Sequence, residues 1–214
     1  KKFKKNIFTD DSLIFYKLKK KIKLINGETL NFKITTKEDY KFGKLLFKGA
    51  KQMKDIRVGN GFDVHKFKNG DTLKLFGIKL PFTKSLEGHS DADVGFHSIV
   101  DAILGALCMG DIGNHFPPTD NKWKNKSSIF FMNFVKKLLV QKKYKINNLD
   151  ITLICEEPKV SKYQKDFISS ISNALELDQK LINVKGTTTE KLGFLGRGEG
   201  IACQVSVTIS NNEK

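Results

Sequence analysis

Carboxylate and imidazole side chains at short spacings indicate a metal centre. Asp63 and His65 stand at the end of a strand that we predict over residues 56–65, where alternate side chains point to the same side of a sheet. Alone, such a pair more often marks a solvated strand end with a surface histidine. His97 adds a third ligand from a helix predicted over residues 91–107, and three ligands with an open fourth position are typical of catalytic zinc.

Polar residues around this helix could orient the ligands or bind an anion. Asp93 and Asp101 lie one helical turn on either side of His97, so each could hold the imidazole in place, although both could equally be surface charges of the helix. His89 and Ser90 come just before the helix, where backbone N–H groups bind anions readily. An ordinary N-cap turn would use the same two residues.

Three further segments contain polar residues in turns. Asp111 and Asp120 flank a loop stiffened by two glycines and two prolines, and their carboxylates could bind hydroxyl groups. Residues 187–190, TTTE, fit either a helix capping box or a site for a diphosphate with its magnesium, and the spacing does not decide between them. Residues 155–159 end in a proline-stiffened bend whose backbone could contact a planar base, and residues 197–200 form a turn with an ion pair.

Periodic apolar patterns predict the elements that must position these residues. Besides the first strand and helix, we expect a hairpin, two more helices and two alternating strands. The hairpin covers 72–82, the helices follow Ser127 or Ser128 and Ser161, and the strands cover 149–155 and 201–209. The clean alternation of 201–209 predicts a sheet with helices on one face and a half-polar face that could meet a neighbouring subunit.

Charge divides the chain into two parts. The net charge of +15 suggests an anionic partner such as nucleic acid, a membrane or phosphate. Residues 1–56 hold 16 Lys and 6 acidic residues, so most of the excess lies in a segment without chemistry-bearing motifs. We therefore expect a lineage-specific, Lys-rich N-terminal extension over 1–55 and one domain over 56–214.

The cysteines and the hydropathy bound the environment of the protein. Cys108, Cys155 and Cys203 are scattered among apolar residues, so we expect no disulfide framework and a reducing compartment. No stretch approaches the ~20 apolar residues of a membrane span. We expect a soluble chain whose N-terminus has been trimmed.

Taken together, the motifs resemble those of the 2-C-methyl-D-erythritol 2,4-cyclodiphosphate synthase family, in the same order and at matching intervals. The resemblance spans residues 56 to about 209 and rests on four segments. They are RVGNGFDVHKF, GHSDADVGFHSIVDAILGALCMGDIGNHFPPTD, EEPK and INVKGTTTEKLGFLGRGEGIAC. The resemblance implies a homotrimer of α+β subunits, each with a four-stranded mixed β-sheet and helices on one face, and with active sites at the subunit interfaces.

The resemblance also implies roles for individual residues. It places zinc on Asp63, His65 and His97, places a second ion, Mg²⁺ or Mn²⁺, on Glu190, and gives catalytic roles to His89 and Thr188. The implied substrate-binding residues are Asp63, His65, His89, Ser90, Asp111, Ile112, Gly113, Phe116, Asp120, Lys159, Thr187, Thr188, Thr189, Glu190, Phe194 and Arg197. Phe62, Arg197 and Glu199 align with residues beside a cavity on the trimer axis, where the family can bind an isoprenoid diphosphate.

The implied reaction is an intramolecular phosphoryl transfer in isoprenoid precursor biosynthesis, with no protein nucleophile. The 2-phosphate of 4-diphosphocytidyl-2-C-methyl-D-erythritol 2-phosphate attacks the β-phosphorus of its own diphosphate, and CMP leaves. The chain departs from the usual family residues at Asn60 (His), Ala92 (Gly), Pro118 (Asp) and Glu157 (Ala). None of these is a metal ligand, but Pro118 and Glu157 bear on the substrate and base pockets.

Three other functions are compatible with parts of the sequence. A zinc-dependent phosphohydrolase could use the same three ligands, although the motifs offer no clear general base for it. The basic N-terminal segment could bind nucleic acid, but it lacks the spacing of a known RNA motif, and we expect neither a nucleic-acid nor a membrane partner. The extension could also regulate an ordinary enzyme. From the Lys- and Asn-rich composition we expect a plastid-type stroma, apicoplast or chloroplast, after removal of a targeting segment.

Overall fold

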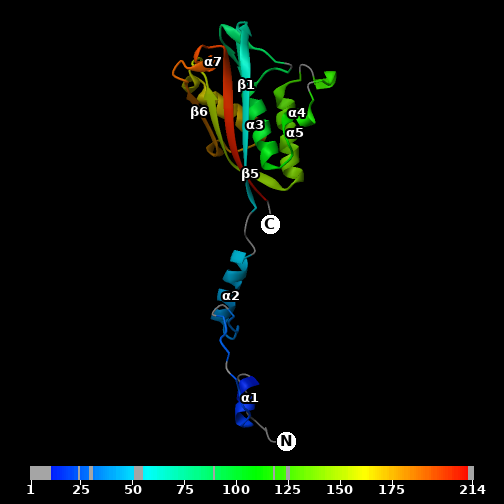
Figure 1. Ribbon diagram of the computed structural model, residues 1–214, viewed down its shortest axis with the longest axis vertical. Coiled ribbons are helices and arrows are strands. Elements are labelled where there is room, and N and C mark those ends of the chain that lie inside the picture. The colour runs from blue at the N-terminus through cyan, green and yellow to red at the C-terminus, as the bar shows by residue number, and fades with distance from the viewer. Residues whose placement is uncertain are drawn as a thin grey trace. The chain divides into compact units, whose positions relative to one another are not determined.

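The computed structural model describes residues 11–23, 25–28, 31–50, 55–88, 90–117, 119–123 and 126–211. It divides the chain into two compact units, Lys1–Met53 and Lys54–Lys214. In the first unit, helix α1 spans Asp11–Lys17 and helix α2 spans Lys37–Ala50 (Figure 1). Helix α2 leaves several large apolar side chains exposed. They are Tyr40, Phe42, Leu45, Leu46 and Phe47.

The second unit is built on a mixed sheet of five strands in the order β4-β1-β7-β5-β6. The strands are β1 (Ile56–Asn69), β4 (Lys84–Leu86), β5 (Tyr144–Ile154), β6 (Ile182–Thr187) and β7 (Gly200–Asn211). Strands β5 and β6 are parallel, and the other neighbours are antiparallel. The α+β class and the mixed sheet are confirmed, but the expected count of four strands is wrong. The extra strand, β4, has three residues, too few to show an alternating pattern in the sequence.

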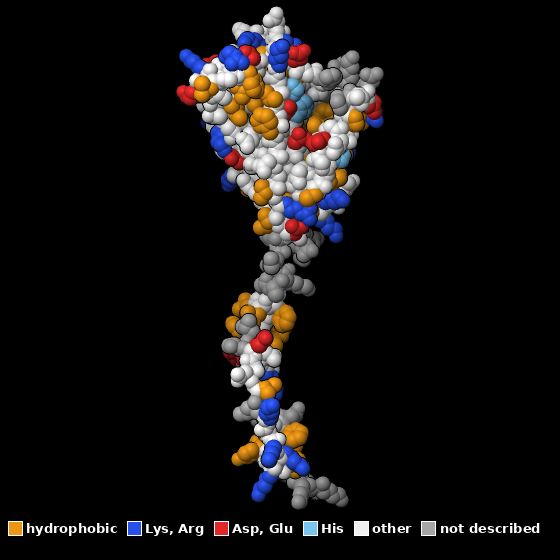
Figure 2. Space-filling view, viewed as in Figure 1, with side chains coloured by type: hydrophobic (Ala, Val, Ile, Leu, Met, Phe, Trp, Pro, Cys, Tyr) orange, Lys and Arg blue, Asp and Glu red, His pale blue; other side chains and the backbone are white. Residues whose placement is uncertain are grey.

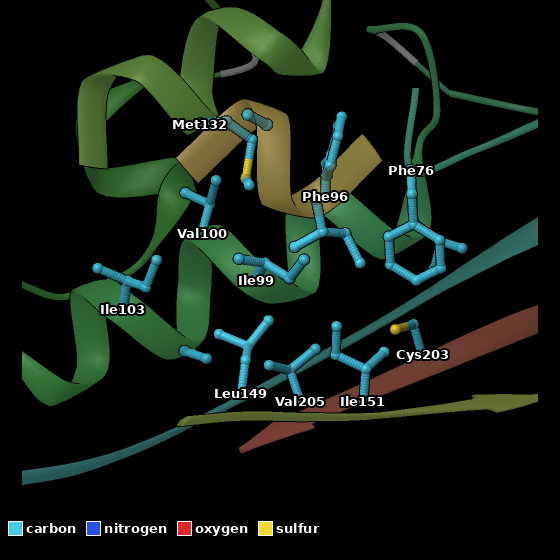
Figure 3. Packing of buried hydrophobic residues seen from close by; sticks show 14 of the residues in the cluster. Phe76, Phe96, Ile99, Val100, Ile103, Met132, Leu149, Ile151, Cys203 and Val205 are labelled. Atoms are coloured by element: carbon cyan, nitrogen blue, oxygen red, sulfur yellow. The ribbon is translucent and has the colours of Figure 1, made fainter. Parts of the chain in front are cut away.

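Helices α3 (Val94–Ala106), α5 (Ser128–Gln141) and α6 (Gln164–Leu175) cover one face of this sheet. Short turns of helix connect the larger elements. They are α4 (Ile112–His115), α7 (Gly193–Gly196), η1 (Asn121–Trp123), η2 (Val160–Lys162) and η3 (Gln179–Leu181). In Figure 3, apolar side chains of α3 point toward those of β5 and β7, with Met132 above them. Burial of this apolar surface holds the helices on the sheet.

Helix α3 lies unusually close to β1 because two glycines face it. A Cβ atom on Gly59 would lie 1.9 Å from the carbonyl oxygen of Ala102, and one on Gly61 would lie 2.0 Å from the carbonyl oxygen of Ser98. Any larger residue at either position would therefore push the helix away. The close approach matters because β1 and α3 together carry the predicted metal ligands.

The turn of the hairpin is anchored to the start of helix α3. Strands β2 (Thr72–Leu75) and β3 (Ile78–Pro81) are joined by Phe76 and Gly77, both with positive φ (51° and 79°), as a tight hairpin turn requires. Asp93 is the N-cap of α3, where it accepts from the N–H of Phe96 at 3.1 Å. The same carboxylate accepts from the N–H groups of Phe76 and Gly77, at 2.8 and 2.5 Å.

The other predicted helix starts need correction. Ser161 does not cap α6, because it lies within the short turn η2 and α6 begins at Gln164. Ser127 occupies the N-cap position of α5 but makes no side-chain capping bond. The hydroxyl of Ser128 instead donates to Asp91.

The uncovered face of the sheet carries an apolar strip on β1 beside polar residues. Ile56, Val58, Phe62 and Val64, here called the β1 strip, are 40–62% exposed. Polar side chains on the same face bond from strand to strand, as Ser206 of β7 does when it donates to Asn60 of β1 at 2.8 Å. Cys108, Cys155 and Cys203 are all free thiols. Among the residues that the structure describes, every helix is too short or too polar to cross a bilayer.

Candidate metal centre and active site

The three predicted metal ligands meet where the middle of β1 faces the first turn of α3, because β1 continues to Asn69, beyond the strand end predicted at His65. The Oδ2 atom of Asp63 lies 3.0 Å from Nε2 of His65 and 3.1 Å from Nδ1 of His97. The two imidazole nitrogens are 3.4 Å apart. Figure 2 shows pale-blue histidine side chains beside red carboxylates on this surface of the domain. One carboxylate oxygen and two ring nitrogens thus surround a space suited to a single ion.

The neighbours of His65 leave its inner nitrogen free for a metal. Its Nδ1 atom lies 2.8 Å from the carbonyl oxygen of Glu87. A carbonyl can only accept, so Nδ1 carries a proton. In the neutral ring the lone pair of Nε2 points toward Asp63 and His97, whereas in the protonated ring Nε2 donates to Asp63. Such an outer hydrogen bond is the usual partner of a metal-binding histidine. The donor set therefore fits a divalent ion such as zinc.

The acidic residues predicted to orient His97 have other tasks. The carboxylate of Asp93 binds the hairpin turn and the start of α3, as described above. Asp101 accepts from the backbone N–H of Ile112 at 2.7 Å, which ties the start of α4 to α3. The Nε2 atom of His97 lies instead 3.1 Å from both Ser90 Oγ and Ser128 Oγ. These two hydroxyl groups are the outer partners of this ligand.

The electrostatics of the three ligands favour a bound cation. Burial raises the pKa of the Asp63 carboxyl, but the hydrogen bonds to His65 and His97 outweigh it and hold that pKa well below its usual range. Burial lowers the pKa of the His65 imidazole, and its hydrogen bond to Asp63 more than offsets this, so the net shift is upward. A carboxylate that stays ionised beside two imidazoles offers negative charge to a metal ion.

An open pocket of about 840 Å³ leads to these ligands. Four other residues predicted to bind substrate line it: Ser90, Ile112, Gly113 and Phe116. Phe116 is 8% exposed and packs against Phe131, with ring centroids 4.7 Å apart, so it forms part of the apolar wall.

The structure gives two other predicted substrate residues local bonds. Asp111 caps α4 by accepting from the N–H of Asn114 at 2.8 Å. Asp120 forms a 2.6 Å ion pair with Lys122. Neither is among the residues that line the pocket of the metal ligands. His89, predicted to be catalytic, and Pro118 lie outside the described residues.

A second pocket, of about 320 Å³, lies at the other edge of the sheet. Lys159, Thr187 and Thr188 line it, beside Glu156. The Oε1 atom of Glu156 accepts from the N–H of Thr189 at 3.1 Å and so shapes the turn after β6. No helix begins at Thr187, because β6 ends there and a turn follows, so the capping-box alternative is excluded.

The remaining predicted site residues follow Thr188 in the sequence, and their side chains are exposed. Glu190 accepts from the hydroxyl of Thr188 at 2.7 Å. Arg197 forms a 2.6 Å ion pair with Glu199. Phe194 is 47% exposed, on the short helix α7. All three leave their side chains accessible to solvent or to another molecule.

Three departures from the family pattern have a local structural context. Ala92 has φ of 53°, a left-handed conformation that favours glycine, which is the usual family residue there. Asn60 lies on the uncovered sheet face and accepts from Ser206. Glu157 is exposed, and its Oε1 atom lies 3.6 Å from Nζ of Lys159, a residue that lines the second pocket. Ala92 lies nearest the metal ligands, since its N–H donates to the Oγ atom of Ser90 at 3.4 Å.

The fold and the site define the class of protein: an α+β domain with three residues, Asp63, His65 and His97, that could hold one metal ion. The model of the YgbB family matches residues 56–210. The chain therefore belongs to the YgbB family.

Comparisons with known proteins agree with this membership. The chain is 49% identical over 210 residues to the bifunctional enzyme IspD/IspF of Wolbachia pipientis wMel, covering 96% of this chain and 52% of that protein. It is 40% identical to the solved structure of IspF from Plasmodium falciparum in complex with CDP, with a TM-score of 0.67, covering 74% of this chain and 97% of that one. The bifunctional IspDF of Campylobacter jejuni has a TM-score of 0.69 at 40% identity, covering 96% of this chain and 55% of that one.

Two facts about these relatives bear on our expectations. The chain spans about half the length of the curated relatives that it matches. Those relatives come from bacteria, including Wolbachia, Bartonella and Rhodobacter. The expected plastid-type location is therefore wrong, because composition alone cannot separate an AT-rich bacterial genome from that of a eukaryote with a plastid.

Sequence reasoning missed several residues that support the site. Glu87 acts through its backbone carbonyl, which no side-chain pattern could reveal. Ser128 was expected only to cap a helix, and Asp91 was given no role. Lys74, whose Nζ lies 2.5 Å from Asp91, belongs to the hairpin and carried no motif.

Proposed function

We propose that residues 56–211 form the active domain of a 2-C-methyl-D-erythritol 2,4-cyclodiphosphate synthase. The observation that carries this proposal is the convergence of Asp63, His65 and His97 on one space at the base of an open pocket. Membership of the YgbB family narrows the chemistry to that of its characterised members, two of which were solved with CDP. The product is a cyclic diphosphate, and CMP is released.

Zinc is the ion we assign to the three ligands. Asp63, His65 and His97 would hold the ion, and zinc bound there would supply Lewis-acid polarisation of a phosphoryl group. We assign Mg²⁺ or Mn²⁺ to Glu190, whose exposed carboxylate sits in a turn with Thr188. Hard oxygen ligands suit both ions.

The second pocket is our proposed cytidine diphosphate site. Lys159 brings a positive charge to it, while Thr187 and Thr188 bring hydroxyl groups beside the end of β6. Backbone groups of the bend at 155–159 can bind the planar base. The similar IspF of Plasmodium falciparum was solved as a complex with CDP, which supports a nucleotide ligand for this chain.

We propose that the complete active site forms between subunits of a homotrimer. Strands β7 and β5 separate β1, which carries Asp63 and His65, from β6, which ends at Thr187. Three strand spacings amount to about 14 Å, so within one chain the two pockets lie at opposite edges of the sheet. The uncovered β1 strip supplies apolar surface for such an assembly. We also keep the proposal that Phe62, Arg197 and Glu199 border an axial cavity for an isoprenoid diphosphate.

The chain acts by positioning and by charge. The oxygen of the 2-phosphate forms a bond to the β-phosphorus, the bond from that phosphorus to the bridging oxygen breaks, and the oxygen leaves with CMP. Ser90 lies beside His97 and can donate to a phosphate oxygen. Lys159 and the Thr187–Thr188 pair hold the leaving nucleotide in line. The apolar wall at Phe116 excludes water that would otherwise hydrolyse the diphosphate.

We propose that residues 1–55 belong to a domain that precedes residues 56–211, and not to the lineage-specific extension expected from the sequence. More of this chain is covered by the bifunctional IspDF structure, 96%, than by the IspF structure, 74%. Helix α2 exposes Tyr40, Phe42, Leu45 and Phe47, which the rest of such a domain would cover. In the longer protein, amide hydrogens of α2 should exchange more slowly than in this chain, and unchanged exchange would contradict the assignment.

The product assay tests the function. The protein is incubated with 4-diphosphocytidyl-2-C-methyl-D-erythritol 2-phosphate and Mg²⁺, with and without a zinc chelator, and products are followed by mass spectrometry. We expect CMP and the cyclic diphosphate in equal amounts, and neither with chelator or in His97→Ala. Release of inorganic phosphate alone would support a zinc phosphohydrolase, and intact substrate in the metal-replete sample would contradict both activities.

A further inference from the structure

A chain of polar side chains runs from the hairpin to the back of His97. The Nζ atom of Lys74 lies 2.5 Å from Asp91 Oδ2, and the hydroxyl of Ser128 donates to Asp91 Oδ1. The same Ser128 oxygen lies 3.1 Å from Nε2 of His97. Three separate elements, β2, the loop before α3 and the start of α5, thus meet behind one predicted metal ligand.

The direction of these hydrogen bonds follows from the charge at their far end. An ionised carboxylate can only accept, and the Lys74 ammonium keeps Asp91 ionised. The single hydroxyl proton of Ser128 therefore points to Asp91. Toward His97 the Ser128 oxygen has only lone pairs left, so it accepts from Nε2–H.

Without the hydrogen bond accepted by Ser128, the proton of the neutral His97 ring could lie on Nδ1 instead of Nε2. Ser90 Oγ is also 3.1 Å from Nε2, and a serine hydroxyl free to rotate could donate to that nitrogen. On the other side of the ring, Asp63 Oδ2 lies 3.1 Å from Nδ1 and would accept a proton there. A proton on Nδ1 occupies the lone pair that a metal needs. The hydrogen bond to Ser128 opposes this arrangement.

We propose that Asp91 and Ser128 are positioning residues that hold the His97 proton on Nε2 and so keep Nδ1 open for the metal ion. The proposal rests on the metal binding assigned to this site, but not on the cyclase reaction. It gives Ser128, buried with 0% exposure at the start of α5, a task that helix capping does not explain. The outer partners of metal-binding histidines commonly change metal affinity by about 10- to 100-fold when they are removed.

The test measures zinc affinity, by competition with a chromophoric chelator, in Ser128→Ala, Asp91→Asn and the double variant. We expect each single variant to weaken zinc binding about 10- to 100-fold. Because Asp91 acts through Ser128, the double variant should bind no more weakly than Ser128→Ala. Ser127→Ala is the matched control, since Ser127 directly precedes Ser128, is exposed and makes no side-chain capping bond.

A spectroscopic measurement separates this role from general support of the fold. In zinc-loaded protein labelled with ¹⁵N-histidine, the Nε2–H of His97 should exchange slowly with solvent, and faster in Ser128→Ala. Unfolding of the metal-free variants, followed by circular dichroism, shows whether each is folded. If Ser128→Ala does not fold, Asp91→Asn and the wild-type exchange measurement still decide.

Three results would overturn the proposal. A folded Ser128→Ala that binds zinc as tightly as the parent would remove the role of the hydroxyl. Losses that multiply in the double variant would show that Asp91 and Ser128 act independently. Rapid exchange of the His97 Nε2–H in the zinc-loaded parent would show that Ser128 does not hold this proton. None of these readouts uses the substrate. The proposed role of Asp91 and Ser128 can therefore be refuted while the cyclase assignment stands, and the cyclase assignment can be refuted while that role stands.

Discussion

Gly61→Ala should damage both the fold and the metal centre, because it separates the two elements that carry the ligands. The new Cβ would lie 2.0 Å from the carbonyl oxygen of Ser98 and 2.7 Å from the backbone nitrogen of Ala102, both in α3. To reach ordinary contact, α3 must withdraw from β1 by roughly 1.4 Å. Overpacking of this kind costs about 3 kcal/mol.

The same displacement acts on the ligands. Gly61 precedes Asp63 by two residues on β1, and His97 precedes Ser98 on α3. Metal–ligand distances tolerate deviations of only about 0.2 Å, so a shift of ~1.4 Å between the elements should weaken zinc binding by about 100-fold or more. The assays are chemical denaturation of the metal-free protein and chelator competition for zinc.

Gly105→Ala is the control for this prediction. Its added Cβ would meet only the carbonyl oxygen of Asn60, at 3.7 Å, and Gly105 lies on the exposed side of α3. Alanine is a better helix former than glycine, so this variant should be more stable by about 0.5–1 kcal/mol. If Gly61→Ala stays within about 0.5 kcal/mol of the parent and binds zinc equally well, the close packing of α3 does not position the site.

Three other changes test separate parts of the structure. Equal amounts of His97→Ala and Thr188→Ala subunits, unfolded and refolded together, should recover about one quarter of the parent activity. Random assembly unites two intact half-sites at one interface in four. If no activity is recovered, the site is not shared between subunits. Burial raises the pKa of Asp91, but hydrogen bonds from Lys74 and Ser128 outweigh it and lower that pKa from 3.8. The contribution of Asp91 to stability is therefore present above about pH 4 and is lost as the pH falls through the folded-state pKa. Between pH 6 and roughly pH 3, the denaturation midpoint of metal-free Asp91→Asn should change less than that of the metal-free parent. Phe116→Ala should lower the free energy of unfolding by about 3–5 kcal/mol, whereas Phe194→Ala, at an exposed position, should change it by less than about 0.5 kcal/mol; equal effects would contradict the assigned burial.

The cluster of the three candidate metal ligands could be predicted from sequence because local geometry places each of them. Asp63 and His65 are two apart on a strand, and His97 opens a helix whose apolar period is clear, so each element presents its ligand without knowledge of the rest. The long strands β5 and β7 were predicted from alternation in the same way. Strand β4 was not, since three residues paired to the end of β1 leave no period to detect.

The support of the site could not be predicted, because it depends on contacts between distant segments. Asp91 and Ser128 are 37 residues apart and meet only once α5 has packed on α3. Asp93 and Asp101 had the right helical spacing to reach His97, yet the hairpin turn and the start of α4 compete for their carboxylates. Spacing identifies which residues share a helix face, but tertiary packing decides which partner each one finds.

The most direct test of the central claim is the reaction in water enriched in ¹⁸O. If the 2-phosphate of the substrate is the nucleophile, CMP and the cyclic diphosphate should form in a ratio of one to one, and neither product should contain ¹⁸O from the solvent. Incorporation of solvent ¹⁸O into CMP or into a linear phosphate product would show that water attacks instead. The three-ligand centre would then belong to a hydrolase, contrary to the function proposed for this domain.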